Sequence, residues 1–319
     1  MRTKLTKKLT IALLSGGTSS EREVSLNSGA QVFEALDPDT YTVLRYDPQS
    51  DLPRLGADAA RIDAALIILH GANGEDGTVQ GLLDLLNIPY QGAGVLGSAV
   101  AMNKLAAKRL YEHAGLPVPA YAVVRRGQVL EPEALANRLG LPLVVKPVVG
   151  GSSVGISIVR RMEELPAAVG SALRHDAVVL IEAYIHGTEI TGGVLGNDTL
   201  EALPIIEIIP TTGHEFFDYQ AKYLPGASEE ICPARIDAEL TARAQHYAME
   251  AHRALFCRGY SRTDMMLRDR DIFILETNTI PGMTSTSLLP RAARTAGMSF
   301  SRLLDRLIEL SLEGRAAAR

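Results

Sequence analysis

The chain has 319 residues, a formal net charge of −5 and 46% hydrophobic residues, which predicts a folded globular protein of two domains or three smaller lobes. The acidic balance argues against nucleic acid as a partner, because a protein that neutralises many phosphates needs an excess of basic residues. Cys232 and Cys257 are far apart in sequence and outside any CxxC pattern, which argues against disulfides and thiolate metal sites and favours a reduced, cytoplasmic protein.

The first residues are basic and are followed by an apolar run. That run covers only residues 11–14 before two glycines, shorter than the ~7–15 residues of a signal peptide's apolar region. It therefore predicts a buried first strand. No run elsewhere approaches the ~18 apolar residues of a membrane span, so no membrane association is expected.

The first third of the chain alternates predicted strands and helices. Strands are predicted at residues 9–14, 41–46 and 64–69, and helices after the glycine-rich turn up to Leu36 and over residues 79–86. This alternation predicts a doubly wound parallel sheet, in which ligands lie beyond the carboxyl ends of the strands. The loops after Leu14 and Leu69 are therefore candidate binding loops.

The rest of the chain is predicted as two α+β regions. A helix over residues 98–114 ends before a proline-containing connection. Further strands are predicted at residues 121–124, 142–146, 156–159, 178–182, 191–195, 202–209, 262–267 and 272–276, and helices over 238–255 and 300–313. Residues 148–153, VVGGSS, indicate a flexible glycine-serine loop between two strands.

Four polar residues lie in phase on two of these strands. Strand periodicity puts Arg262 and Asp264 on one face, and likewise Glu276 and Asn278, so a short connection would bring all four together. Two carboxylates and an amide oxygen are ligands suited to Mg²⁺. The alternative is a set of salt bridges on exposed strands, which the apolar context disfavours because unpaired buried charge is costly.

Weaker signals surround this set. Lys146 ends a buried strand beside the glycine-serine loop, where it could meet a phosphate that loop N–H groups also contact. His70 follows the third strand, where binding and structural roles are equally expected. Glu182 and Glu189 could contact adenine and ribose, although surface carboxylates are the simpler reading, and Lys104 is by default on a solvated helix face. No Walker A, GxGxxG, GxSxG or HExxH motif is present.

Six segments of the chain resemble those of the ATP-grasp ligases, and among these the chain is most similar to the D-alanine–D-alanine ligases. They are residues 16–29 (GGTSSEREVSLNSG), 69–81 (LHGANGEDGTVQG), 143–157 (LVVKPVVGGSSVGIS), 216–224 (FFDYQAKYL), 262–267 (RTDMML) and 276–290 (ETNTIPGMTSTSLLP). Together they span nearly the whole chain.

The resemblance implies an α/β and α+β ATP-grasp fold. It implies an amino-terminal substrate-binding lobe (residues 1–95) and two lobes that clamp ATP (residues 96–187 and 188–319). It further implies a cytoplasmic, ADP-forming acid–amino-acid ligase that joins two D-alanine molecules through a D-alanyl phosphate, for peptidoglycan precursor synthesis. The resemblance also implies ATP and two Mg²⁺ ions as cofactors, with Mn²⁺ able to replace Mg²⁺. It implies a homodimer as the assembly.

Residue by residue, the resemblance implies a role for each matching position. On the substrate side, Glu21 would bind the first D-alanine's ammonium and His70 would lie near its carboxylate; Arg262 and the Gly282 backbone would stabilise the oxyanion, and Ser287 with the Leu288 N–H would bind the second substrate's carboxylate. On the nucleotide side, Lys104, Lys146 and Lys222 would bind phosphates, Gly151, Ser152 and Ser153 would cover them, Glu182 and Glu189 would hold adenosine, and Asp264, Glu276 and Asn278 would bind the metal ions.

Tyr223 bears on substrate choice. In the family, the matching tyrosine is hydrogen-bonded to the residues that match Ser152 and Glu21. The resemblance therefore implies catalytic roles for Tyr223, Ser152 and Glu21. The depsipeptide ligases carry another residue in place of this tyrosine. Its presence favours D-alanine over D-lactate; a D-alanine–D-lactate or D-alanine–D-serine ligase and a non-catalytic ATP-binding module remain the alternatives. The chain departs from the family at Ala183, Ile280 and Thr286, where lysine, serine and histidine are common. At Ala183 the adenine contact is expected to come from the backbone or to be absent. Neither Ile280 nor Thr286 removes a charged catalytic group, so altered affinity is expected there.

Overall fold

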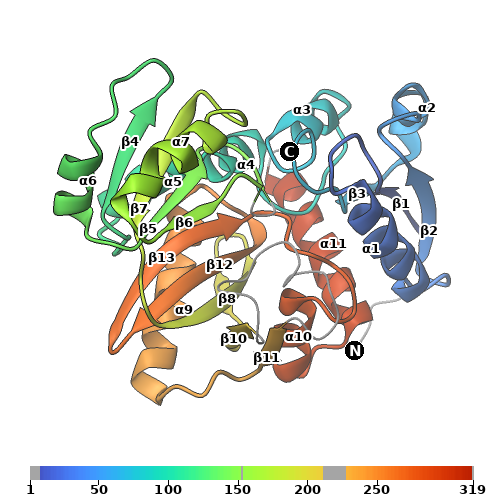
Figure 1. Cartoon of the computed structure of the whole chain (residues 1–319). Helices are drawn as coiled ribbons and strands as arrows, with labels where there is room; N and C mark the ends of the chain where they lie inside the picture. The colour runs from blue at the N-terminus through green and yellow to red at the C-terminus, as the bar shows by residue number, and fades with distance from the viewer. Residues whose placement is uncertain (1–7, 152–153, 211–227, 318–319) are drawn as a thin grey trace.

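The computed structural model describes residues 8–151, 154–210 and 228–317 of the chain. The first sheet has three parallel strands in the order β2-β1-β3 and lies at one end of the molecule with α1 and α2 (Figure 1). All of β3 and the last four residues of β1 are buried, as expected for apolar strands covered on both faces. The elements of this part are β1 (Leu9–Leu14), α1 (Arg22–Ala35), β2 (Tyr41–Tyr46), α2 (Leu52–Asp58), β3 (Ala64–Ile67) and α3 (Thr78–Leu85).

The second sheet has four antiparallel strands in the order β4-β7-β5-β6. The alternation of β7 divides its apolar residues between two faces: Val179 and Ile181 pack with α6 and α7, whereas Leu180 packs with Leu105 of α5. Helix α5 is therefore the inner cover of this sheet. The elements are α4 (Val95–Met102), α5 (Lys104–His113), β4 (Tyr121–Arg125), α6 (Pro132–Leu139), β5 (Leu143–Pro147), β6 (Ser157–Val159), α7 (Leu165–Ala172) and β7 (Val178–Ala183).

The third sheet has six antiparallel strands, in the order β11-β10-β8-β12-β13 with β9 beside β8. One face packs against α9, where Ala248 meets Ile190 and Met265 in a single apolar cluster. The elements are β8 (Thr188–Gly196), β9 (Leu200–Ala202), β10 (Ile206–Pro210), β11 (Ser228–Ile231), α9 (Ala238–Ala254), β12 (Gly259–Arg268), β13 (Asp271–Asn278), α10 (Leu288–Thr295) and α11 (Phe300–Ala317).

The first and third sheets share one core. Leu13 of β1 and Leu66 of β3 belong to the same apolar cluster as Leu303 and Leu307 of α11. The Tyr41 hydroxyl also donates a hydrogen bond of 2.9 Å to Asp305 in α11. Helix α11 therefore fixes the amino-terminal sheet against the carboxy-terminal part of the chain (Figure 1).

Two predicted elements were wrong. The helix predicted over residues 98–114 is two helices, because Asn103 is extended (φ −91°, ψ 96°) and its side chain accepts a 2.9 Å hydrogen bond from the Ala106 N–H at the start of α5. The strand predicted over residues 202–209 is also divided, into β9 and β10, around Pro204, which has no N–H to donate. The other predicted strands and helices are present, with ends that differ by a few residues. No described helix is long and apolar enough to cross a membrane.

Candidate active site

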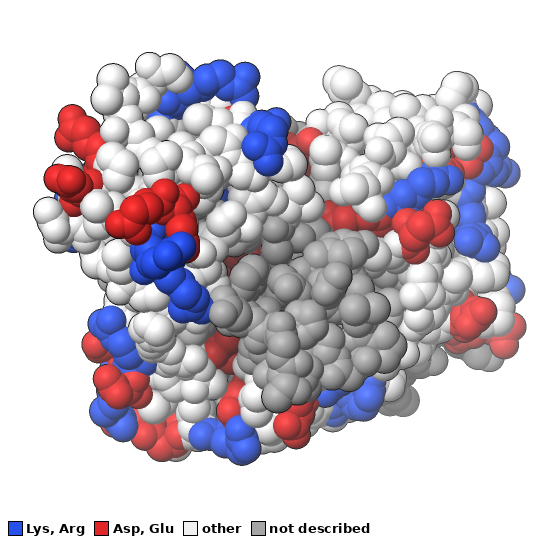
Figure 2. Space-filling view, in the orientation of Figure 1, with Lys and Arg blue, Asp and Glu red and all other residues white. Residues whose placement is uncertain are grey.

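Two cavities meet at β13. The large cavity, of about 940 Å³, lies between the loops that follow β1 and β3, the start of α5, and β12, β13 and α10. The intersheet cavity, of about 400 Å³, lies between the four-stranded and six-stranded sheets. Glu276 lines both cavities, so this residue stands where they join. On the face shown in Figure 2, Lys and Arg are interspersed with Asp and Glu among the residues coloured by type.

Glu21 and His70 line the amino-terminal wall of the large cavity. Glu21 precedes α1, and its carboxylate lies so near two loops that a Cβ atom at Gly71 or Gly151 would be 3.0 or 3.4 Å from Oε2. Glycine at both positions therefore leaves room for this carboxylate, and the structure brings Glu21 close to Gly151, two residues that were predicted for different parts of the site.

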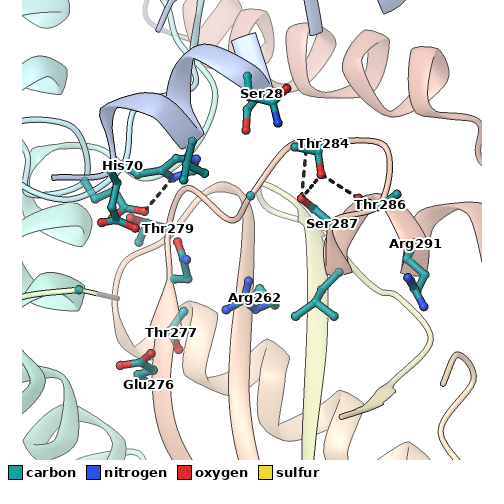
Figure 3. A pocket seen from close by; sticks show the side chains of 18 of the residues that line it. Ser28, His70, Arg262, Glu276, Thr277, Thr279, Thr284, Thr286, Ser287 and Arg291 are labelled. Atoms are coloured by element: carbon teal, nitrogen blue, oxygen red, sulfur yellow. Dashed lines mark hydrogen bonds and ion pairs between the residues drawn. The ribbon is translucent and has the colours of Figure 1, made fainter. Parts of the chain in front are cut away.

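His70 is buried, and its Nδ1 atom lies 3.7 Å from Oε1 of Glu75 (Figure 3). Burial lowers the pKa of His70, but the neighbouring Glu75 carboxylate outweighs that effect, so the pKa is raised above its ordinary value. The protonated form of this imidazole is therefore more favoured than that of a free histidine.

The start of α10 forms the opposite wall. Ser287 precedes α10, accepts a 3.1 Å hydrogen bond from the Thr284 N–H, and lies 2.7 Å from the Thr284 hydroxyl. A Cβ atom at Gly282 would be 3.0 Å from the Ser287 hydroxyl, so glycine permits this close turn. Gly282, Ser287 and Leu288 all line the cavity, and a helix amino terminus favours a bound anion.

The four polar residues predicted to meet on β12 and β13 do so. Arg262 pairs in register with Asn278, and Asp264 pairs with Glu276. Arg262 donates two hydrogen bonds to Asp264, from Nε at 2.8 Å and from Nη2 at 2.7 Å, and both side chains are buried. In the view of Figure 3, Arg262 projects between Glu276 and the Ser287 side chain.

The donor set fits a divalent cation. Asp264 and Glu276 are neighbours on adjacent strands, and Asn278 lies two residues beyond Glu276 at the cavity wall. These hard oxygen donors suit Mg²⁺, although Oδ1 of Asn278 already accepts a 2.9 Å hydrogen bond from the Ile280 N–H. Among the described residues, no three His, Cys, Asp or Glu side chains form a metal-binding group, and the predicted set contains only two carboxylates.

The intersheet cavity is an apolar slot with polar ends. Val144 and Ile158 line it from the four-stranded side, and Met266 and Leu275 line it from the six-stranded side. Glu182, Glu189 and Lys146 are among the charged residues that also line it. A slot of this kind suits a flat aromatic ring that carries polar groups.

Glu182 is held by two lysines. Oε1 lies 2.7 Å from Nζ of Lys108, and Oε2 lies 2.7 Å from Nζ of Lys146. Burial raises the pKa of the Glu182 carboxyl, but the charges of Lys146 and Lys108 outweigh it and leave this pKa below its ordinary value. Glu182 is therefore an ionised acceptor at the edge of the slot.

Of the three lysines predicted to bind phosphate, Lys104 and Lys146 line different cavities. Lys146 lies in the intersheet cavity, whereas Lys104 lines the large cavity and donates to the Gly150 carbonyl of the glycine-serine loop. A phosphate chain reaching from one cavity to the other would pass between them. The predictions for Ser152, Ser153, Lys222 and Tyr223 lie outside the described residues.

Sequence reasoning missed three features of the site. It gave no role to Glu75 beside His70, to Lys108, or to Arg291, whose Nη2 lies 2.9 Å from Oε2 of Glu230 in the large cavity. The position of Glu75 in the candidate binding loop after Leu69 was the sequence feature that could have indicated its place in the site. The four-residue spacing of Lys104 and Lys108 was the only local sign that Lys108 faces the site.

Comparison with known proteins agrees with this geometry. Residues 47–93 match the family model for the D-ala D-ala ligase N-terminus, and residues 110–309 match that for its C-terminus. The D-alanine–D-alanine ligase of Syntrophobacter fumaroxidans is 66% identical over 97% of this chain and 99% of its own length.

Solved structures give the same result. The D-alanine–D-alanine ligase from Bacillus anthracis, complexed with ATP, is 36% identical with a TM-score of 0.85 and covers 98% of this chain and 100% of its own. The VanG D-Ala:D-Ser ligase from Enterococcus faecalis is 35% identical with a TM-score of 0.80, over 96% of this chain and 100% of its own. The chain thus has the ATP-grasp architecture of these enzymes along nearly its whole length, and it belongs to the D-alanine–D-alanine ligase family.

Proposed function

We propose that the chain joins two molecules of D-alanine to D-alanyl-D-alanine at the expense of ATP, releasing ADP and phosphate, for peptidoglycan precursor synthesis. The observation that carries the proposal is the in-register set of Arg262, Asp264, Glu276 and Asn278 at the junction of the two cavities. A nucleotide in one cavity and amino acids in the other would meet at this set. Family membership supports the same reaction.

The reaction has two displacement steps. A carboxylate oxygen of the first D-alanine attacks the γ-phosphorus, the bond to ADP breaks, and a D-alanyl phosphate forms. The amine of the second D-alanine then attacks the acyl carbon, loses a proton, and phosphate leaves. Glu21 and His70 would hold the first substrate, and Ser287 with the Leu288 N–H would hold the carboxylate of the second. Arg262 and the Gly282 N–H would stabilise the oxyanion of the tetrahedral intermediate.

Asp264, Glu276 and Asn278 would hold two Mg²⁺ ions, or Mn²⁺ in their place. When bound, the metal offsets negative charge on the phosphates. The bidentate contact with Arg262 fixes the orientation of the Asp264 carboxylate, so this ligand is oriented before any ion arrives.

The adenine ring would occupy the intersheet slot, with Glu182 and Glu189 toward the amino group and the ribose. Lys146, Lys104 and Lys222 would contact the phosphates, and residues 150–154, which include Gly151, Ser152 and Ser153, would cover them. A cover of this kind keeps water from the acyl phosphate, which would otherwise be hydrolysed.

We also propose three lobes, residues 1–95, 96–187 and 188–319. This division is supported by the sheets, because each of the three falls within one range. A cytoplasmic homodimer is proposed from the family alone, and light scattering of the purified protein tests the dimer.

Phosphate release by the purified protein tests the function. With ATP and Mg²⁺, release should require D-alanine, should not occur with L-alanine, and should yield D-alanyl-D-alanine. Release only when D-lactate or D-serine accompanies D-alanine would instead assign the enzyme to the depsipeptide or D-serine ligases. ATP binding without release under any of these conditions would leave a non-catalytic module.

Replacement of Tyr223 by phenylalanine tests acceptor choice. The resemblance places a hydroxyl here in contact with Ser152 and Glu21, so its loss should let D-lactate compete better with D-alanine. The measurement is the ratio of dipeptide to depsipeptide formed from an equimolar mixture. Tyr219→Phe, the same change nearby in the chain, is the matched control and should leave the ratio unchanged. An unchanged ratio in Tyr223→Phe would show that Tyr223 does not determine acceptor choice.

A further inference from the structure

Helix α5 directs three polar side chains toward different parts of the site. Lys104, Lys108 and Tyr111 follow the three- and four-residue spacing of one helix face. Lys104 lines the large cavity, Lys108 reaches Glu182 at the intersheet cavity, and the Tyr111 hydroxyl donates a 2.7 Å hydrogen bond to Thr277 on β13. The function proposed above assigns no role to Lys108.

Lys108 is unusual because it is buried. Its relative exposure is 1%, beside 2% for Glu182 and 6% for Lys146. Its ammonium also lies 5.3 Å from the centre of the Tyr121 ring, a favourable position for a cation. Burial lowers the pKa of Lys108, and the charge of Glu182 opposes that effect.

One lysine would suffice to neutralise Glu182, yet two are present. They contact different oxygens, and Lys146 lines the intersheet cavity whereas Lys108 approaches from α5. With one oxygen held at each side, the carboxylate cannot rotate freely about its terminal bond. Lys108 therefore fixes the orientation in which Glu182 faces the slot, and it supports the ionised form that can only accept hydrogen bonds.

We propose that Lys108 is a positioning residue for the nucleotide base, which holds Glu182 as a fixed, ionised acceptor so that the site takes a 6-aminopurine and rejects a 6-oxopurine. The inference rests on the proposed placement of adenine in the intersheet cavity. An adenine amino group donates to a carboxylate, whereas the 6-oxo group of hypoxanthine presents a second acceptor and is repelled.

The test is direct nucleotide binding, measured by calorimetry on the full chain with Mg²⁺ and without D-alanine. Wild type should bind ATP more tightly than inosine triphosphate, and Lys108→Met should reduce that preference by about tenfold or more. Lys108→Arg, which keeps the cation, should retain most of the preference. If Lys108→Met does not fold, Lys108→Gln replaces it, because it removes the charge but keeps a hydrogen-bond donor.

Two controls separate positioning from general damage. Lys104→Met, one turn earlier on the same face, should weaken the binding of ATP and of inosine triphosphate by a similar factor. The ratio of the two dissociation constants should therefore stay unchanged. In a Glu182→Gln background, Lys108→Met should change the ratio no further, because Lys108 acts through that carboxylate.

Each failure has a distinct meaning. If wild type binds the two nucleotides equally, Glu182 does not recognise adenine and the inference about Lys108 is overturned. The proposed ligase function, tested by D-alanine-dependent phosphate release, is not affected by that result. If wild type prefers ATP and a folded Lys108→Met or Lys108→Gln variant keeps the full preference, the inference alone is overturned.

Discussion

Glu276→Gln is expected to lower kcat for D-alanine-dependent ADP release by about 10³-fold or more. Glu276 lines both cavities and pairs in register with Asp264, so its carboxylate stands where the phosphoryl group would be transferred. Glutamine keeps the shape of the side chain but removes the negative charge that a divalent cation requires at this point. ADP release followed over a range of Mg²⁺ concentrations measures the effect.

Asp271→Asn provides the matched control for this substitution. Asp271 is exposed at the other end of β13, so the same change from carboxylate to amide should leave kcat near that of wild type. Circular dichroism should be unchanged in both variants. A folded Glu276→Gln variant with kcat near that of wild type would exclude Glu276 as a metal ligand.

Much of the fold follows from residue periodicity. β1 and β3 were predictable because their continuous apolar runs suit strands buried on both faces, and the structure confirms them. The two wrong elements share one physical cause, a single residue that interrupts an apolar pattern. Asn103 caps a new helix with its side chain, and Pro204 cannot continue a ladder of hydrogen bonds.

The site was predictable where its residues lie on neighbouring strands. Alternation along β12 and β13 placed Arg262, Asp264, Glu276 and Asn278 on matching faces, and the observed register brings them together. Their roles in metal and oxyanion binding stay predictions. Periodicity predicted which residues share a face of each strand, but not the register: an irregularity between Asp264 and Met265 shifts the pairing by one residue and brings Asp264 opposite Glu276.

Contacts between distant elements could not be predicted in this way. The four-residue spacing from Lys104 puts Lys108 on the same helix face, but nothing local indicates that Glu182 of β7 lies against it. The same limit applies to Lys104 and Lys146, which the resemblance assigned to the ATP phosphates and which line two different cavities. Their separation follows from how α5 and the four-stranded sheet pack, and this depends on tertiary contacts.

Arg262→Met is expected to destabilise the folded protein by about 3–5 kcal/mol, in addition to its effect on catalysis. Both members of the Arg262–Asp264 pair are buried, with side-chain exposures of 10% and 6%. Loss of the guanidinium leaves the Asp264 carboxylate with a hydrogen bond of 2.6 Å from the Thr191 hydroxyl but, within the described part of the chain, without its ion-pair partner. Urea denaturation monitored by circular dichroism measures the change in free energy of unfolding.

The double variant Arg262→Met/Asp264→Leu separates the lost ion pair from simple loss of side-chain packing. If the cost arises from an uncompensated carboxylate, replacing that carboxylate with an apolar group should recover most of the stability, although activity stays abolished. Arg270→Met, which removes an exposed arginine from its contacts with Asp237 and Glu239, should have a much smaller effect. A double variant no more stable than Arg262→Met would mean that Arg262 stabilises β12 through packing, and the buried pair would then matter to the reaction alone.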